Sequence, residues 1–137
     1  MPEPQWLDRD LVDALHEQSL HMHGGLAGVR DVHVLEAAIA SPRNLWAYQG
    51  EENLFRLAAH LLVSLAKAHP YSDGNKRIAI ISAVAFLGSN GIELSIGAGE
   101  LVPQTIRAAR CQEEERALEE EAIALWLQLS SRHSNAS

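Results

Sequence analysis

Hydrophobic residues are concentrated in two long stretches of the chain, 51–68 and 76–89. In both stretches, apolar side chains recur at helical spacing and cover nearly every face of the expected helix. A helix that is apolar on almost all sides is buried among other elements. The pattern therefore predicts two central helices over about 51–68 and about 76–89, the second of which ends at Asn90 and Gly91.

Weaker helical patterns lie on both sides of this pair. Near the start of the chain, Asp8 can cap a helix whose apolar residues follow at helical spacing, and the glycines of 24–28 end it. Later helical patterns cover about 101–110 and about 113–129, whereas 92–100 suit a short extended piece and a turn. Because strand signals are weak throughout, we expect one all-α, bundle-like domain over the whole chain.

A shorter helix is predicted between the glycines and the first central helix. Asp31 is its expected N-cap, and the helix covers 32–40. Ser41 and Pro42 are predicted to end it, because a residue that precedes proline disfavours helical geometry. Residues 43–50 are then expected to form a loop with exposed aromatic side chains.

Composition adds limits to this picture. The 137 residues fit one domain with a single core, and 47% hydrophobic residues are ordinary for a globular protein. With a net charge of −7, the chain lacks the excess of basic residues that is typical of nucleic-acid-binding proteins. No direct nucleic-acid contact is therefore expected. The single cysteine excludes an internal disulfide, and the first ten residues lack a secretory pattern. No apolar run is long enough for a bilayer, and we expect a cytoplasmic protein without membrane contact.

The densest polar cluster, HPYSDGNKR at 69–77, lies between the two predicted central helices. Pro70 is expected to end the first helix, and Gly74 to supply a backbone conformation that other residues disfavour. The second helix then begins with free N–H groups directed at the loop, which form a ready anion site. Lys76 and Arg77 are unfavourable at a helix N-terminus unless an anion is bound there, and phosphate fits best.

The other side chains of the cluster suit transfer of a phosphorus group. Asp73 is a hard oxygen ligand, and one carboxylate with phosphate oxygens is the usual way to hold Mg²⁺. Asn75 can donate to a phosphate oxygen, and Arg77 can bind phosphate in a bidentate manner. His69 can accept the proton of an attacking hydroxyl. From the residues alone an alternative stays open, in which Asp73 only caps the helix and the charges lie in water.

HPYSDGNKR resembles the signature loop of the Fic/Doc family, H-P-F-x-D/E-G-N-G/K-R, with Tyr71 in place of phenylalanine. Residues 24–42 place a Gly-Gly-x-x-Gly-x-x-Asp stretch before a short helix, and they resemble the death-on-curing (Doc) branch. The resemblance runs over roughly 7–102, and the last 35 residues fit less clearly. It implies a Fic/Doc-type helical bundle with the loop between two central buried helices.

The resemblance also implies a role for each side chain of the loop. His69 would be the base that activates a target hydroxyl, and Asp73 would bind Mg²⁺ and position the nucleotide phosphates. The anion hole and its cationic wall would consist of Gly74, Asn75, Lys76 and Arg77. Tyr71 would anchor the loop in the core, where its hydroxyl needs a partner.

Two positions bear on the subtype. Most of the family has glycine in place of Lys76 and transfers AMP, and those members have a second arginine where this chain has Ile80. Lys76 resembles the Doc branch, which is thought to bind ATP reversed, so that the γ-phosphate meets a threonine of elongation factor Tu and protein synthesis stalls. The resemblance therefore implies an ATP- and Mg²⁺-dependent protein kinase. AMP transfer and a catalytically silent binding module are the alternatives.

A protein partner is implied as well. The self-inhibiting motif of the family, Ser/Thr-x-x-x-Glu-Gly/Asn, is absent, because the Glu52-Asn53 pair has Tyr48 at the hydroxyl position. A toxin of this kind would be restrained by a cognate antitoxin, whose helix or disordered tail folds onto it.

Several histidines lie outside the loop. His21 and His23 are two residues apart and do not share a helix face, so no metal site is expected. His16 and His33 are expected at the surface or in caps. His60 is expected to be a hydrogen-bonded core residue.

Arg56 is expected to pair with an acidic residue, and Lys67 is a candidate for contact with phosphate or antitoxin. Trp46 and Tyr48 lie in the region that resembles the target-docking flap of the family. Either they line a target cleft or they pack on the core, and the sequence leaves both open. Cys111 is expected to be a packing residue, since no base lies beside it.

Overall fold

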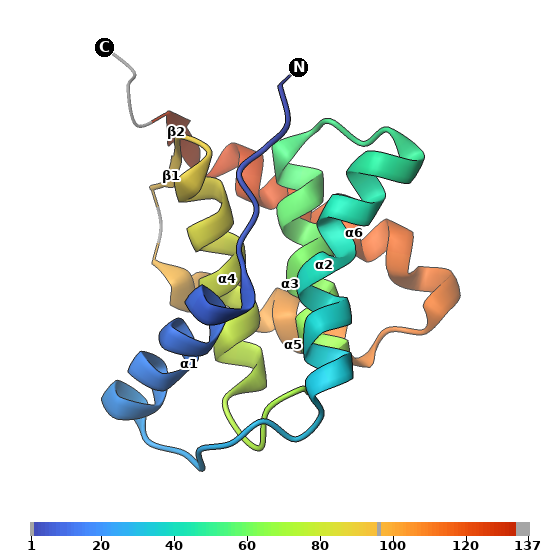
Figure 1. Ribbon diagram of the computed structural model, residues 1–137. Coiled ribbons are helices and arrows are strands. Elements are labelled where there is room, and N and C mark those ends of the chain that lie inside the picture. The colour runs from blue at the N-terminus through green and yellow to red at the C-terminus, as the bar shows by residue number, and fades with distance from the viewer. Residues whose placement is uncertain (1, 96, 134–137) are drawn as a thin grey trace.

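The computed structural model describes residues 2–95 and 97–133. In this part of the chain, six α-helices pack into one bundle beside a short two-stranded ribbon (Figure 1). The prediction of an all-α bundle is confirmed. The helices are α1 (Arg9–His23), α2 (Val32–Gln49), α3 (Leu54–Ala68), α4 (Asn75–Ser89), α5 (Val102–Arg110) and α6 (Arg116–Leu129). Short 3₁₀ turns, Ala98–Leu101 and Glu113–Glu115, precede α5 and α6.

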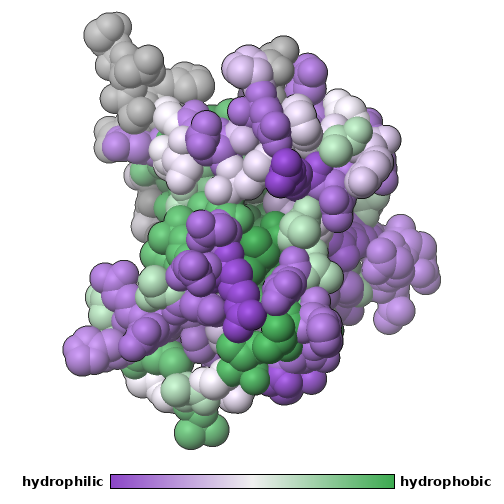
Figure 2. Space-filling model, in the orientation of Figure 1, coloured by the Kyte–Doolittle hydropathy of each residue, from purple (hydrophilic) through white to green (hydrophobic). Residues whose placement is uncertain are grey.

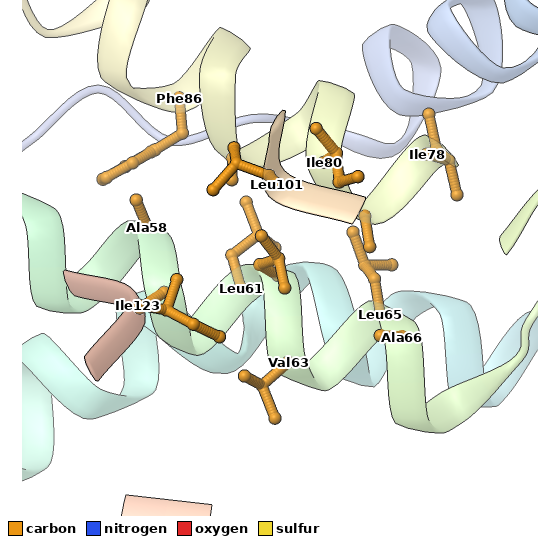
Figure 3. Packing of buried hydrophobic residues seen from close by; sticks show 14 of the residues in the cluster. Ala58, Leu61, Val63, Leu65, Ala66, Ile78, Ile80, Phe86, Leu101 and Ile123 are labelled. Carbon is orange, nitrogen blue, oxygen red and sulfur yellow. The ribbon is translucent and has the colours of Figure 1, made fainter. Parts of the chain in front are cut away.

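The two central helices are α3 and α4, as the hydrophobic pattern predicts. Helix α3 contacts α2, α4, α5 and α6, so it has little polar surface to present. In Figure 3 the side chains of Leu61 and Leu65 lie between α3 and α4, on the side of Ile78 and Ile80, and Ile123 comes from α6. Each such fully buried side chain stabilises the fold by about 1.5–3 kcal/mol relative to exposure.

Side-chain caps set the start of three helices. Asp8 and Asp31 each accept a hydrogen bond from the backbone N–H three residues further on, at 2.8 and 3.1 Å, which confirms both predicted caps. Helix α3 begins at Leu54 rather than near residue 51, because the Asn53 carboxamide accepts two N–H groups of its first turn.

Helix α2 is longer than predicted. The prediction that it ends at Ser41 and Pro42 and that 43–50 form a loop is wrong, since the helix continues to Gln49 and ends at Gly50 in left-handed geometry. Proline lacks the N–H that would bond the carbonyl of Ala38. The Ser41 hydroxyl donates to that carbonyl instead, at 2.8 Å, and the continuing helix keeps its acceptor satisfied.

The aromatic residues of this segment behave differently from each other. Trp46 packs edge-on against Trp6, with ring centroids 5.8 Å apart, and Trp6 stacks on Phe86 of α4 at 5.7 Å. Tyr48 is 84% exposed. Trp46 therefore packs on the core, whereas Tyr48 lies on the surface.

Strand β1 (Ile92–Leu94) pairs antiparallel with β2 (Ser131–His133). The extended piece predicted within 92–100 is confirmed for β1. Its partner strand directly follows α6 and carries no strand pattern in the sequence. The ribbon and the N-terminal segment lie at one end of the molecule, and the turn 69–74 lies at the other (Figure 1).

On the face shown in Figure 2, hydrophobic surface gathers between the N-terminal segment and α2, and polar side chains border it. A cavity of about 370 Å³ lies there, lined by Trp6, Leu7, Arg9, Glu36, Ile39, Ala40 and Arg43. Arg9 pairs with Glu36 at 3.2 Å and Arg43 with Glu3 at 3.5 Å. The cations at this cavity are therefore neutralised within the chain. No helix in the described part of the chain combines the length and apolar character needed to cross a bilayer.

Candidate active site

The turn 69–74 joins α3 to α4, in the place predicted for it. It begins with His69, which caps the end of α3 in the left-handed region (φ 47°, ψ 56°). It ends with Gly74, which precedes α4 in the same region (φ 76°, ψ 18°). His69 and Gly74 both have left-handed backbone geometry, and together they turn the chain sharply within six residues. Of the two, only Gly74 lacks a β-carbon, so only Gly74 adopts this geometry without strain.

All six predicted site residues line one cavity of about 310 Å³ together with Ser72. They are His69, Asp73, Gly74, Asn75, Lys76 and Arg77. The side chain of His69 lies at the surface, as does that of Lys76. The structure therefore brings the predicted residues together at the N-terminus of α4, and their chemical roles stay predictions.

The N-terminus of α4 is uncapped. No side chain bonds its first turn, and within the described residues the backbone N–H groups of Asn75, Lys76 and Arg77 have no hydrogen-bond partner. The Nη1 atom of Arg77 is buried without any hydrogen-bond partner. Unpaired donors at a positive helix end form an anion site, and a buried orphan donor is costly unless a ligand satisfies it. This donor set fits a phosphate chain.

Asp73 does not cap α4, so the alternative in which the loop only caps helices is wrong for this residue. Its Oδ1 accepts the N–H of Gly74 at 2.8 Å, and its Oδ2 accepts the N–H of Leu26 at 3.2 Å. The bond from Gly74, followed by that from Leu26, lowers the pKa of the Asp73 carboxyl below its usual value. The carboxylate stays charged and keeps free lone pairs, which suits a divalent cation.

The hydrogen bond from Leu26 to Asp73 requires a glycine at the neighbouring position 25. A β-carbon on Gly25, whose φ is +124°, would lie 2.9 Å from Asp73 Oδ2. Among the described residues there is no group of three or more His, Cys, Asp or Glu side chains that could hold a metal ion. A Mg²⁺ ion at Asp73 would therefore take its other ligands from phosphate oxygens and water.

The side chain of Asn75 is occupied by the turn itself. Its Oδ1 accepts the N–H of Tyr71 at 2.9 Å, and its Nδ2 donates to the Tyr71 carbonyl at 3.0 Å. The side chain therefore has a structural role in the turn, and the second N–H of Nδ2 has no partner in the described residues, so donation to phosphate stays a prediction. Asn75 also offers its backbone N–H to an anion.

Tyr71 anchors the turn in the core, as predicted. It is 2% exposed, and its hydroxyl donates to Asp13 Oδ1 of α1 at 2.6 Å, so the partner that the hydroxyl requires is Asp13. Burial, and then the bond to Asp13, raises the pKa of Tyr71 far above its usual value. The ring stacks on that of His16, with centroids 3.6 Å apart.

The prediction that His16 lies at the surface or in a cap is wrong. The side chain is 4% exposed, and its Nε2 lies 2.8 Å from the carbonyl oxygen of Asp73, to which it donates. One signal was present in the sequence, because His16 lies four residues after Val12 on the buried face of α1. Its partner, 57 residues further on, had no such signal.

A segment between α1 and α2 runs beside the turn, and its contacts were not predicted. Ser72 donates its N–H to Gly28 at 3.0 Å, Val29 forms an isolated bridge with Tyr71, and Arg30 donates its N–H to Pro70 at 2.7 Å. The same segment passes the turn at the lower end of the molecule in Figure 1. The glycine-rich stretch therefore holds the signature loop in place.

Comparison with known proteins decides the family. The sequence profile of the Fic/DOC family matches residues 6–87, which include α1 to α3, the whole turn and α4 as far as Leu87. The chain belongs to the Fic/Doc family.

Two relatives are similar over most of their length. Protein kinase doc of Escherichia phage P1 is 38% identical over 96 residues, which cover 70% of this chain and 75% of that protein. Toxin Doc of Mycolicibacterium smegmatis (strain ATCC 700084 / mc(2)155) is 40% identical over 92 residues, which cover 66% of this chain and 68% of that protein. The resemblance found in the signature loop is thus confirmed over the helices that present it.

Other polar residues of this Fic/Doc chain serve the packing of helices. His60 Nδ1 lies 2.9 Å from Glu120 Oε1, and Arg56 pairs with the same carboxylate at 3.4 Å. The pairing predicted for Arg56 and the hydrogen bond predicted for His60 are confirmed, but His60 is only partly buried and does not belong to the core. Lys67 donates to the carbonyl of Cys111, so in this structure its ammonium contacts the segment between α5 and α6 and not the turn.

Proposed function

We propose that this chain is the toxin of a toxin–antitoxin pair and acts as a protein kinase. It would transfer the γ-phosphate of ATP to a serine or threonine hydroxyl of a translation factor, elongation factor Tu, and so inhibit protein synthesis. The observation that carries the proposal is the uncapped N-terminus of α4, where Arg77, whose Nη1 has no hydrogen-bond partner, lines the same cavity as His69. Names of relatives add support, since one is called a protein kinase and another a toxin.

The phosphate chain of ATP binds at the start of α4. The free N–H groups of 75–77 donate to phosphate oxygens, and the guanidinium of Arg77 supplies the donor that has no partner within the chain. Asp73 would hold Mg²⁺, which neutralises charge on the phosphates. Because Asp73 is fixed by Gly74 and Leu26, its carboxylate is already oriented before nucleotide binds.

His69 takes the proton of the target hydroxyl. Its imidazole is exposed and lines the same cavity as the donors, so a side chain of another protein can reach it. Lys76, also exposed beside the cavity, offers its charge to the terminal phosphates. Positioning and charge stabilisation then account for most of the catalysis.

The residue one turn further along α4, Ile80, favours the kinase reaction over AMP transfer. Ile80 is 3% exposed and, with Arg77 and Ile81, lines a mostly apolar cavity of about 300 Å³. No second cation follows Arg77 at that position to bind a more deeply placed phosphate. AMP transfer and a silent binding module remain the outcomes against which the proposal is tested.

The test uses purified protein, elongation factor Tu, Mg²⁺ and ATP labelled at either the α or the γ phosphate. We expect label on the target from γ-labelled ATP alone, and a rate at least about 100-fold lower for His69→Ala, which removes a general base. Label from α-labelled ATP would instead establish AMP transfer. Growth arrest that persists in His69→Ala, with no label from either nucleotide, would establish a binding module.

A cognate antitoxin is part of the proposal. Expression of the chain alone should arrest growth, and co-expression of the small protein encoded beside it should restore growth and yield a complex on co-purification. Arrest that is unchanged by the neighbouring protein, with no complex formed, would contradict the toxin–antitoxin pairing.

A further inference from the structure

We infer that Arg30 is a positioning residue for His69, and that its guanidinium fixes the backbone from which the imidazole projects. The catalytic consequence rests on the proposed function of His69 as base. The conformational consequence does not, and it is measured separately below.

His69 has an unfavourable backbone conformation. Among the described residues it is the single non-glycine residue with positive φ, at 47°. In this region the β-carbon of an L-residue crowds the following carbonyl, so the conformation persists only where the surroundings impose it. The following Pro70 disfavours the right-handed helical region for His69 but does not select the left-handed one.

The imidazole does not hold itself in place. It is exposed, and it has no hydrogen-bond partner within the described part of the chain. The φ and ψ angles of His69 therefore set the direction of its Cα–Cβ bond, and the ring turns about χ1 and χ2 from that starting point. Contacts that fix the peptide groups on both sides of His69 also fix the position from which the imidazole reaches the cavity, and so limit where the base can lie.

Arg30 binds those peptide groups. Its Nε donates to the carbonyl of His69 at 2.8 Å, and its Nη2 donates to the carbonyl of Ala68 at 3.0 Å. Both carbonyls belong to the end of α3, where the helix leaves its last acceptors unpaired. The planar guanidinium bridges two acceptors at once, which the single ammonium of lysine does not reproduce.

The next peptide is held by the backbone of the same segment. The N–H groups of Arg30 and Asp31 both donate to the carbonyl of Pro70, at 2.7 and 3.2 Å. With the side-chain bonds of Arg30, the carbonyls of three consecutive residues, 68–70, are fixed from outside α3. Since the backbone bonds survive a change of side chain, replacing Arg30 releases Ala68 and His69 while the segment stays docked.

The experiment compares Arg30→Ala and Arg30→Lys with Arg107→Ala, which removes an exposed arginine that pairs with Glu119 on the far helix α6. In label transfer from γ-labelled ATP, we expect kcat to fall at least about tenfold for Arg30→Ala, with an unchanged KM for ATP because the donors of α4 are untouched. The kcat of Arg30→Lys is expected to lie between those of Arg30→Ala and the wild type, and the kcat of Arg107→Ala to equal that of the wild type. Millimolar guanidinium should restore part of the activity of Arg30→Ala, whereas sodium chloride should not.

A second readout is independent of activity. In NMR spectra, positive φ gives His69 a strong contact between its own amide and α protons. We expect this signal in the wild type and in Arg107→Ala, and its loss in Arg30→Ala while signals from the core stay in place. Retention of the signal in Arg30→Ala overturns the inference, whatever the enzyme does. If the wild type transfers no label at all, the proposed function fails and this measurement still decides the role of Arg30.

Discussion

At the scale of single residues, the hydroxyl of Tyr71 joins the signature loop to α1. It donates to Asp13, which also pairs with Arg9 at 3.2 Å. Because burial and then Asp13 raise the pKa of Tyr71, the hydroxyl remains a donor at alkaline pH, where an ordinary tyrosine ionises. The bond between Tyr71 and Asp13 is therefore expected to persist at alkaline pH.

Tyr71→Phe removes this bond and leaves the ring in place. We expect the free energy of unfolding to fall by about 1 kcal/mol, the usual net contribution of a hydrogen bond, as measured by urea denaturation. Tyr48→Phe is the matched control, because the Tyr48 side chain is almost fully exposed and its loss of a hydroxyl should have no effect. Equal stability of the two variants would show that the bond to Asp13 contributes nothing.

At the scale of elements, α2 continues past a proline because a serine hydroxyl replaces the missing N–H. Ser41→Ala leaves the carbonyl of Ala38 without that donor, and it also removes the bond to the Ser64 hydroxyl at 2.9 Å. We expect the free energy of unfolding to fall by about 1–3 kcal/mol, the cost of an unsatisfied buried acceptor.

A double-mutant cycle separates the two bonds of Ser41. Pro42→Ala returns an N–H to the helix, so Ser41→Ala should cost less in the Pro42→Ala background than in the wild type. The difference between the two costs measures how much the Ser41 hydroxyl contributes by donating to the Ala38 carbonyl in place of the missing N–H. An identical cost in both backgrounds would assign the whole effect to Ser64.

How much the sequence predicted depends on how local each feature is. The caps Asp8 and Asp31, the two central helices and the polar turn follow from nearby residues, and they were predicted correctly. The prediction that α2 ends at Pro42 followed a local rule, but it was wrong because the Ser41 hydroxyl satisfies the Ala38 carbonyl and the helix continues. His16 and Arg30 act on residues 57 and 39 positions away, so neither helical spacing nor the signature motif could place them at the site.

At the scale of the whole molecule, a buried carboxylate joins helices from both halves of the chain. Glu120 of α6 is 3% exposed and is bound by His60 and Arg56 of α3 and by Arg116 of its own helix, at 2.7 Å. Arg116 also donates to Ser64, which carries the network towards α2. Burial alone would raise the pKa of Glu120, but the bonds from His60 and Arg116 outweigh it and lower the pKa below the usual value.

Glu120→Gln removes the charge that Arg56 and Arg116 neutralise. We expect the free energy of unfolding at neutral pH to fall by about 3 kcal/mol, as for one partner lost from a buried ion pair. Glu121→Gln is the matched control, since Glu121 is exposed and pairs with Arg56 at 3.5 Å, where a surface pair contributes about 0–1 kcal/mol.

The same network predicts acid sensitivity. The folded-state pKa of Glu120 lies below its unfolded value of about 4.3, so its stabilisation is complete above that pH and is lost as pH falls through the lowered folded value. In urea denaturation across this range, the wild type should lose more stability than Glu120→Gln, and the gap between them should close in acid. A constant gap would show that the Glu120 charge is not what stabilises α6 on α3.

The described parts of the two chain ends lie across the molecule from the turn that carries His69 (Figure 1). A purification tag or fluorescent dye joined at either end is therefore attached on the side of the molecule away from the turn 69–74. Protein anchored to a sensor chip through such a tag is expected to present the end with the turn 69–74 away from the chip. A protein ligand that docks on this turn can then be titrated with little steric interference from the support.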